Sequence, residues 1–167
     1  MALATTAKSA QEFVQKMEDR WGRDALENGW TGLPNVILER QQACDLKPVD
    51  INVLMHILKF WWKNHDRPFP KKRTIAECIG MSDSTVQRSI RKMEKFGLIL
   101  REERYDNSHS RRSNYHRLDG LVKRANELGS HAKKVKEQRS KEDADMRKSK
   151  RRPGMALVRS DKKQDAE

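Results

Sequence analysis

Aromatic residues and cysteine are scarce in this sequence of 167 residues. Aromatic residues make up 6% of the chain and charged residues 36%, which limits the size of the core that the chain can bury. The sequence therefore predicts one domain of moderate size with extensions. The two cysteines, Cys44 and Cys78, are too few and too isolated for a disulfide framework or a zinc site. We expect both thiols to be reduced and buried.

Long apolar runs are also missing. No run of about 18 apolar residues occurs, and the start "MALATTAKSAQEF" lacks the basic flank and the long apolar stretch of a signal peptide. We therefore expect a soluble, cytoplasmic protein with no membrane contact. The 8 glycines are scattered singly, the histidines lack metal-ligand spacing, and no nucleophile has a convincing base. These absences predict no enzymatic activity, no metal site and no cofactor.

Positive charge is in excess. Lys and Arg number 36 against 24 Asp and Glu, and the formal net charge is +12. A field of this sign attracts phosphates or anionic lipid, and lipid is the weaker option without a membrane segment. From residue 131 onward the chain is dominated by charged and polar residues and contains "KSKRRPG". We expect this segment to be disordered or a solvated helix, with a basic flexible tail at 140–167.

The first 38 residues predict one helix and a short apolar run. A helical pattern over 9–28, with Ser9 as its N-cap, ends at "NGWTG" because two glycines interrupt it. Its apolar members are Phe13, Val14, Met17, Trp21 and Leu26. A short apolar run at 33–38 is at most an edge strand, since it contains Pro34.

The clearest helical pattern covers residues 50–64, with Asp50 as the N-cap. Its apolar residues recur at steps of three and four and predict a broad buried face made of Ile51, Leu54, Ile57, Leu58, Trp61 and Trp62. The two tryptophans are therefore expected to pack in the core or against a partner. The segment "HDRPFP" should end this helix, because both prolines exclude helix.

The stretch "TIAECIGMSDSTVQRSIRKMEKFG" predicts two helices that cross at a tight turn. Thr74 can cap the first helix, and Gly80 can supply a left-handed residue at its end. Ser82 can cap the second helix. Its inward stripe is expected to be Val86, Ile90 and Met93.

Two strand-like segments follow, "LILREERY" at 98–105 and "SNYHRL" at 113–118, and the polar "DNSHSRR" separates them. They predict a two-stranded wing. A further helix is expected after Asp119 and should continue to residue 139.

Residues 33–121 resemble a winged helix-turn-helix domain of the kind found in bacterial transcriptional regulators and in plasmid or phage replication proteins. The segments that carry the resemblance are "FPKKRTIAECIGMSDSTVQRSIRKMEKFGLI" and "RRSNYHRL". The resemblance implies a mainly α fold with a small β-wing, and a bacterial, plasmid or phage protein associated with the nucleoid. The expected parts are an N-terminal helical arm (1–30), the winged domain (31–120), a C-terminal helix (121–139) and the tail (140–167).

The resemblance also implies which residues contact double-stranded DNA. Ser84, Gln87 and Arg88 are the expected base readers, since Arg can be bidentate to guanine and Gln to adenine. Asp83 departs from this pattern, because a carboxylate repels phosphate. The residues expected to hold phosphates, or to cap the helices beside them, are Lys71, Lys72, Arg73, Thr74, Ser82, Thr85, Arg91, Lys92, Arg111 and Arg112.

Three functions stay open at this point. The first is a sequence-specific transcriptional regulator that pairs as a homodimer through the N-terminal helix, the helix after the wing, or both. The second is a plasmid or phage replication initiator that binds origin repeats with the same domain. The third is an adaptor whose winged helix binds protein, although the outward polar and basic residues of the second helix suit bases and phosphates better.

Overall fold

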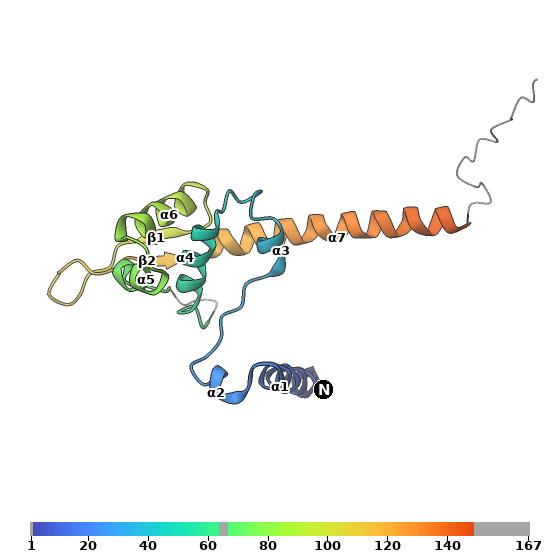
Figure 1. Ribbon diagram of the computed structural model, residues 1–167, viewed down its shortest axis with the longest axis horizontal. Coiled ribbons are helices and arrows are strands. Elements are labelled where there is room, and N and C mark those ends of the chain that lie inside the picture. Colours follow the sequence, from blue (N-terminus) through green and yellow to red (C-terminus); the bar gives the residue numbers. More distant parts are fainter. Residues whose placement is uncertain (1, 64–66, 149–167) are drawn as a thin grey trace, which may run out of the picture. The chain divides into compact units, whose positions relative to one another are not determined.

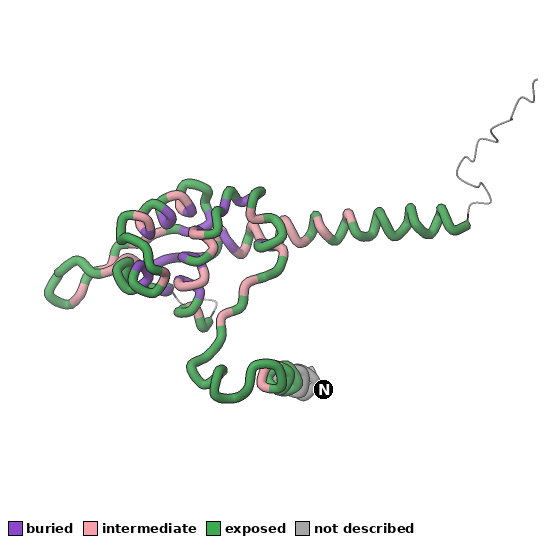
Figure 2. Tube along the Cα trace, viewed as in Figure 1, coloured by how far each residue is buried: buried purple, intermediate pink, exposed green. Residues whose placement is uncertain are grey.

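The core is formed by three helices whose apolar faces meet. The computed structural model describes residues 2–63 and 67–148. Helices α4 (Pro48–Leu58), α5 (Lys72–Ile79) and α6 (Asp83–Lys95) pack on one another, and Figure 1 shows them grouped beside the two strands. Figure 2 shows that most buried positions lie in this group. Its innermost side chains are Val53, Leu54, Ile57, Ile75, Val86, Ile90 and Met93.

Helix α4 begins earlier and ends earlier than the sequence predicted. Pro48 occupies the first turn, where its fixed φ suits a helix start, and Lys47 is the N-cap. The prediction of Asp50 as N-cap is therefore wrong. The helix ends at Leu58, so both tryptophans of the predicted apolar face lie beyond it. Trp61 is half-buried against the core, whereas Trp62 is 71% exposed.

Asp50 instead ties α4 to α6 from within. Its carboxylate is buried and accepts hydrogen bonds from Ser89 Oγ at 2.5 Å and from Lys92 Nζ at 3.0 Å. It also accepts the N–H of Lys47 at 2.9 Å. Burial alone raises the pKa of a carboxyl, but these hydrogen bonds and the Lys92 charge outweigh burial, so the pKa of Asp50 is lowered from 3.8. The contact is stable only while the carboxylate is ionised.

The turn between α5 and α6 follows the predicted chemistry. Gly80 adopts the left-handed conformation, with φ 65° and ψ 34°, and its N–H donates to the carbonyl of Ala76. Ser82 caps α6 by accepting the N–H of Thr85 at 3.2 Å. Both predictions are confirmed. Thr74 is not a cap, because α5 starts at Lys72 and places it inside the first turn.

The predicted wing is confirmed as an antiparallel pair of short strands, β1 (Leu100–Glu102) and β2 (Tyr115–Arg117). The long loop between them projects from the helices (Figure 1). The strands are shorter than predicted because the loop organises its own backbone. Asp106 Oδ1 accepts the N–H groups of Ser108 and Ser110, at 3.0 and 2.8 Å.

The N-terminal helix is present, but it differs from the prediction at both ends. Helix α1 spans Ala2–Trp21 and includes Ser9, which is therefore not its cap. Gly22, with φ 79°, separates it from the short α2 (Arg23–Leu26). The run at 33–38 is not a strand. It forms helix α3 (Asn35–Glu39), which buries Ile37 in the core.

Helix α7 spans Asp119–Lys148 and so continues beyond its expected end at residue 139 into the predicted tail. The chain divides into two units, residues 1–128 and 129–167. In the first unit Leu121 is buried and Leu128 packs partly on the core. Residues 149–167 of the predicted tail lie outside the described part of the chain.

The two cysteines differ in burial. Cys44 is buried as expected, whereas Cys78 is exposed on α5, so its expected burial is wrong. Both are free thiols.

Within residues 2–63 and 67–148, none of the helices combines the length and the apolar character that a membrane crossing requires.

Gly120 marks a close approach between α7 and the end of α6. A Cβ at this position would overlap the carbonyl oxygen of Gly97 and lie 3.3 Å from that of Leu98. We expect Gly120→Ala to lower the free energy of unfolding by about 2 kcal/mol, because backbone atoms would have to move. Gly129, on the same helix, has no atom within 4 Å of an added Cβ, so Gly129→Ala should be stabilising by about 0.5–1 kcal/mol. Urea denaturation of both variants checks the contrast, and equal effects would contradict it.

Asp50→Ala should lower the free energy of unfolding by about 2–3 kcal/mol, because it leaves Ser89 and Lys92 without their buried partner. Asp45→Ala is the matched control, since Asp45 is 3.3 Å from the same amine but 57% exposed, and it should cost less than about 1 kcal/mol. The folded pKa of Asp50 is depressed, so its contribution is complete above pH 3.8 and is lost as the pH falls through the folded pKa. Thermal unfolding at neutral and acid pH should therefore show the variant and wild type converging in acid.

Candidate nucleic-acid interface

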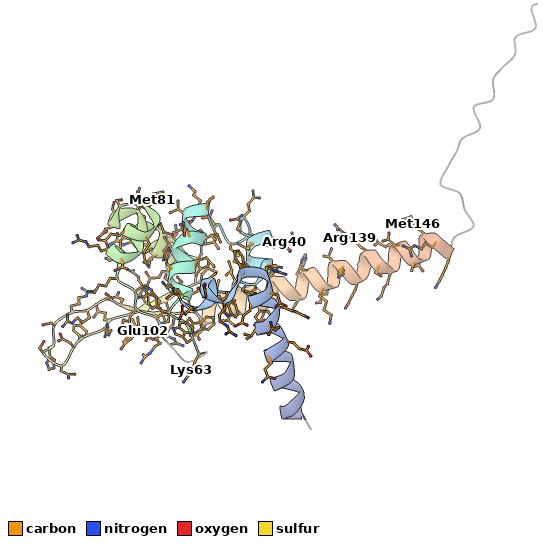
Figure 3. The ribbon with its side chains drawn as sticks, turned by 60° about the horizontal axis from the view of Figure 1, so that its bottom comes forward. Arg40, Lys63, Met81, Glu102, Arg139 and Met146 are labelled. Atoms are coloured by element: carbon orange, nitrogen blue, oxygen red, sulfur yellow. The ribbon has the colours of Figure 1, made fainter. Side chains whose placement is uncertain are left out.

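The exposed start of α6 carries a group of hydroxyls and one arginine. Ser82 Oγ lies 2.8 Å from Ser84 Oγ and 3.0 Å from Thr85 Oγ1. Arg88 lies one helical turn further along, and its Nη2 donates a hydrogen bond to Thr85 Oγ1 at 3.2 Å. Ser84 and Arg88 are both exposed. The structure thus brings these predicted contact residues together on one outward surface, next to the turn that carries Met81 (Figure 3).

Gln87 lies between this surface and α5. It is half-buried, and its Oε1 accepts a hydrogen bond from Lys72 Nζ at 2.5 Å. Its amide NH2 group stays available as a donor. To contact adenine with both its Oε1 and its NH2 group, Gln87 must replace the hydrogen bond from Lys72 with one from the base.

The other predicted phosphate ligands differ in how they are held. Lys92 contacts Asp50 and Asp45 at 3.0 and 3.3 Å, with only 23% of its side chain exposed. It is therefore not placed with the other predicted ligands. Arg73 is exposed and pairs with Glu77 at 2.9 Å. Lys71, Thr74 and Arg91 are exposed, and the structure shows no hydrogen bond or ion pair for these three described side chains.

The wing arginines are exposed and paired within the loop. Arg111 lies 2.9 Å from Glu103, and Arg112 lies 2.6 Å from Asp106. Hydrogen bonds from the Ser108 hydroxyl and the Ser110 N–H, followed by Arg112, lower the pKa of Asp106 to about 2. The loop carboxylate is therefore ionised at neutral pH. Ion pairs as exposed as these are weak, so a phosphate can replace the carboxylate.

A cleft of about 350 Å³ lies between α6 and the wing. It is lined by Pro70, Lys72, Gln87, Ile90, Arg91, Arg101, Arg111, Arg112, Ser113, Asn114 and His116. Five of these side chains are cationic, and none of the described residues that line the cleft is a carboxylate. Arg101 is oriented by an ion pair with Glu94 of α6. Cationic walls around an open cavity concentrate a positive potential there and favour an anionic ligand.

His116 forms the buried wall of this cleft. Within the described chain its Nδ1 has no hydrogen-bond partner. Burial, followed by the nearby Arg101 charge, lowers the pKa of His116 to about 4. The imidazole is therefore neutral at neutral pH, and the positive charge of the cleft comes from lysine and arginine.

Four polar residues of this cleft were not predicted from the sequence, namely Arg101, Ser113, Asn114 and His116. For Arg101 and His116 the available signal was the alternation of the two strands, whereas Ser113 and Asn114 precede β2. Arg101 and His116 face each other in the register, so they share one face of the wing. The alternation does not specify which face of the wing turns toward α6, because that depends on how the strands pack on the helix.

Comparison with known proteins agrees with this geometry. Residues 45–99 match the family of helix-turn-helix domains. A solved structure described as a possible transcriptional regulator from Methanosarcina mazei Go1 is similar at 18% identity, with a TM-score of 0.41, over 65% of this chain and 85% of that one. A likeness this distant carries no information on function. No curated protein is significantly similar to the chain.

The matched residues contain α4, α5, the left-handed Gly80 turn and α6. The antiparallel strand pair begins directly after them and supplies the wing. Residues 45–99 are therefore similar to helix-turn-helix domains, and together with the strand pair they have the architecture of a winged helix-turn-helix.

Proposed function

We propose that this protein is a sequence-specific binder of double-stranded DNA that regulates transcription. The observation that carries the proposal is the cleft between α6 and the wing, which five cations and no carboxylate line among the described residues. A cleft of this charge fits a phosphate backbone. It lies next to a helix whose exposed start presents side chains suited to base edges.

In this proposal the start of α6 enters the major groove, which is wide enough to admit a helix. Ser84 and Arg88 contact base edges, and Gln87 joins them when Lys72 turns to a phosphate. The backbone of one strand then crosses the cleft, where Arg91 and Arg101 meet its phosphates. The wing loop follows the adjacent minor groove with Arg111 and Arg112.

Phosphate contacts position the protein, and base contacts give the sequence preference. Lys71 and Thr74 at the start of α5 add contacts beside the helix N-terminus. Lys92 has a structural role in this account, because Asp50 and Asp45 hold it. We infer a binding role and no catalysis, since in this proposal the residues of the site contact phosphates and base edges.

The N-terminal arm favours a homodimer. Phe13, Val14 and Trp21 are 48%, 51% and 62% exposed on α1. Phe13 contacts Trp30 in a tilted ring pair with centroids 5.6 Å apart, which extends the apolar surface beyond the helix. Surfaces of this kind are buried in partners, and a two-fold dimer matches the two half-sites of a palindrome.

Arg88→Ala should abolish the preference for the selected site over a random duplex and leave weak, salt-sensitive binding. A bidentate contact to guanine contributes about 1–3 kcal/mol of discrimination. Selection of duplexes from a random pool supplies the site, and fluorescence anisotropy measures both affinities. Equal losses on the two duplexes would remove Arg88 from base reading.

The double variant Arg111→Ala with Arg112→Ala is the control for this experiment. It should weaken binding to all duplexes alike and reduce the slope of log K against log salt by about one for each phosphate that the wing no longer binds. A change of sequence preference in this variant would assign base reading to the wing.

Deletion of residues 1–28 should give a folded monomer, because these residues carry the exposed apolar surface of α1. Affinity for a duplex with two half-sites should fall toward that for one half-site, since the second half-site is no longer bound at a high effective concentration. Sedimentation equilibrium measures the assembly. A dimer that persists at micromolar concentration would make α7 the dimerising element, and the full-length Val14→Asp variant separates loss of the surface from loss of the arm.

A further inference from the structure

The wing has a second face that the duplex site does not use. Successive strand residues point to opposite faces, so Arg101 and His116 face the cleft while Glu102 and Tyr115 face away from it. On the far face the Tyr115 ring meets the Phe69 ring edge-on, with centroids 5.6 Å apart and an interplanar angle of 89°. This pair belongs to a wider group of rings and arginines.

Two guanidinium groups cover these rings. Arg104 lies 4.0 Å from the centroid of Phe69 and 5.5 Å from that of Tyr115. The Arg67 guanidinium, on the chain segment that precedes α5, lies 4.8 Å from the centroid of the Tyr115 ring. The result is a series of flat cationic and aromatic groups at the edge of the strand pair. Such groups are held in place by cation–π attraction before any ligand arrives.

The group opens into a groove of about 480 Å³ lined by Phe60, Trp62, Arg67, Pro68, Phe69, Pro70 and Tyr115. Phe60, Phe69 and Trp62 are 45%, 46% and 71% exposed. Aromatic rings clustered at the surface in this number mark an interaction site. The charges around them decide what kind of partner fits.

The carboxylates on this face are already neutralised. Glu102, labelled in Figure 3, accepts from Arg67 at 2.9 Å and from Arg117 at 3.4 Å. Asp119 also pairs with Arg117. No carboxylate of the described chain pairs with Arg104. The groove therefore presents exposed rings, and on one of them, Phe69, lies a guanidinium that none of the described carboxylates neutralises.

We propose that this aromatic–arginine groove binds the unpaired bases of single-stranded nucleic acid. Unpaired bases stack on aromatic rings and on guanidinium planes, and their phosphates supply the counter-ion for Arg104. An apolar peptide covers the rings but leaves that charge unpaired. The proposal stands independently of the duplex site, because it uses the opposite face of the strands. The two sites together would let the protein hold a duplex and a separated strand at once.

The test uses the full-length protein and a labelled single strand of about 12 thymidines, a length suited to such sites. Loss of one stacked base costs about 1–3 kcal/mol, so Trp62→Ala should raise the Kd by about tenfold or more. Phe96→Ala is the matched control. Phe96 is another half-exposed ring, at the end of α6 and outside the groove, and its removal should leave the Kd unchanged.

A second arm separates this site from the duplex site. Arg88→Ala should bind the thymidine strand as tightly as wild type, and saturating unlabelled duplex should not displace the strand. The proposal is overturned if Trp62→Ala binds the strand with wild-type affinity, or if duplex displaces it. It is also overturned if a proline-rich peptide quenches the fluorescence of Trp62 and the thymidine strand does not.

Discussion

The buried carboxylate of Asp50 is the contact on which the proposed duplex site depends. It fixes α6 against α4 through Ser89 and Lys92, beside the buried side chains of Val86, Ile90 and Met93. The side chains of Ser84, Arg88 and Arg91 are consequently exposed. A buried carboxylate is tolerated because three donors satisfy it. Removing Asp50 takes this acceptor from Ser89 and from the Lys47 N–H, and leaves Lys92 with the more exposed Asp45. An interior ion pair thus acts together with the apolar packing of α6 to orient the proposed recognition surface.

A second constraint is the alternation of the two wing strands. Because neighbouring residues point to opposite faces, three residues on each strand are enough to create two different surfaces. One face turns cations toward α6 and suits a duplex backbone. The other turns Tyr115 toward Phe69 and the arginines that cover the rings. In our account the wing is the element that two forms of nucleic acid share.

Sequence reasoning succeeded where the chemistry is local. Gly80 and Ser82 were predictable because a left-handed residue and an N-cap act on backbone groups within a few positions. It failed where residues far apart in the sequence determine which side chains are buried or paired. Lys92 looked like a phosphate ligand, but its partner Asp50 is 42 residues away in sequence. Trp62 fitted a buried helical stripe, but α4 ends before reaching it. The cleft likewise needs strand pairing and helix packing together.

We propose that duplex DNA contacts the exposed start of α6 and the cleft beside it. The most direct test follows backbone amide chemical shifts while the selected duplex is titrated into the protein. We expect the largest changes at residues 82–91, at Arg101 and His116, and in the wing loop at 103–114, with small changes at Trp62 and Phe69. Changes concentrated at Trp62 and Phe69, or on α1, with residues 82–91 unaffected, would contradict it.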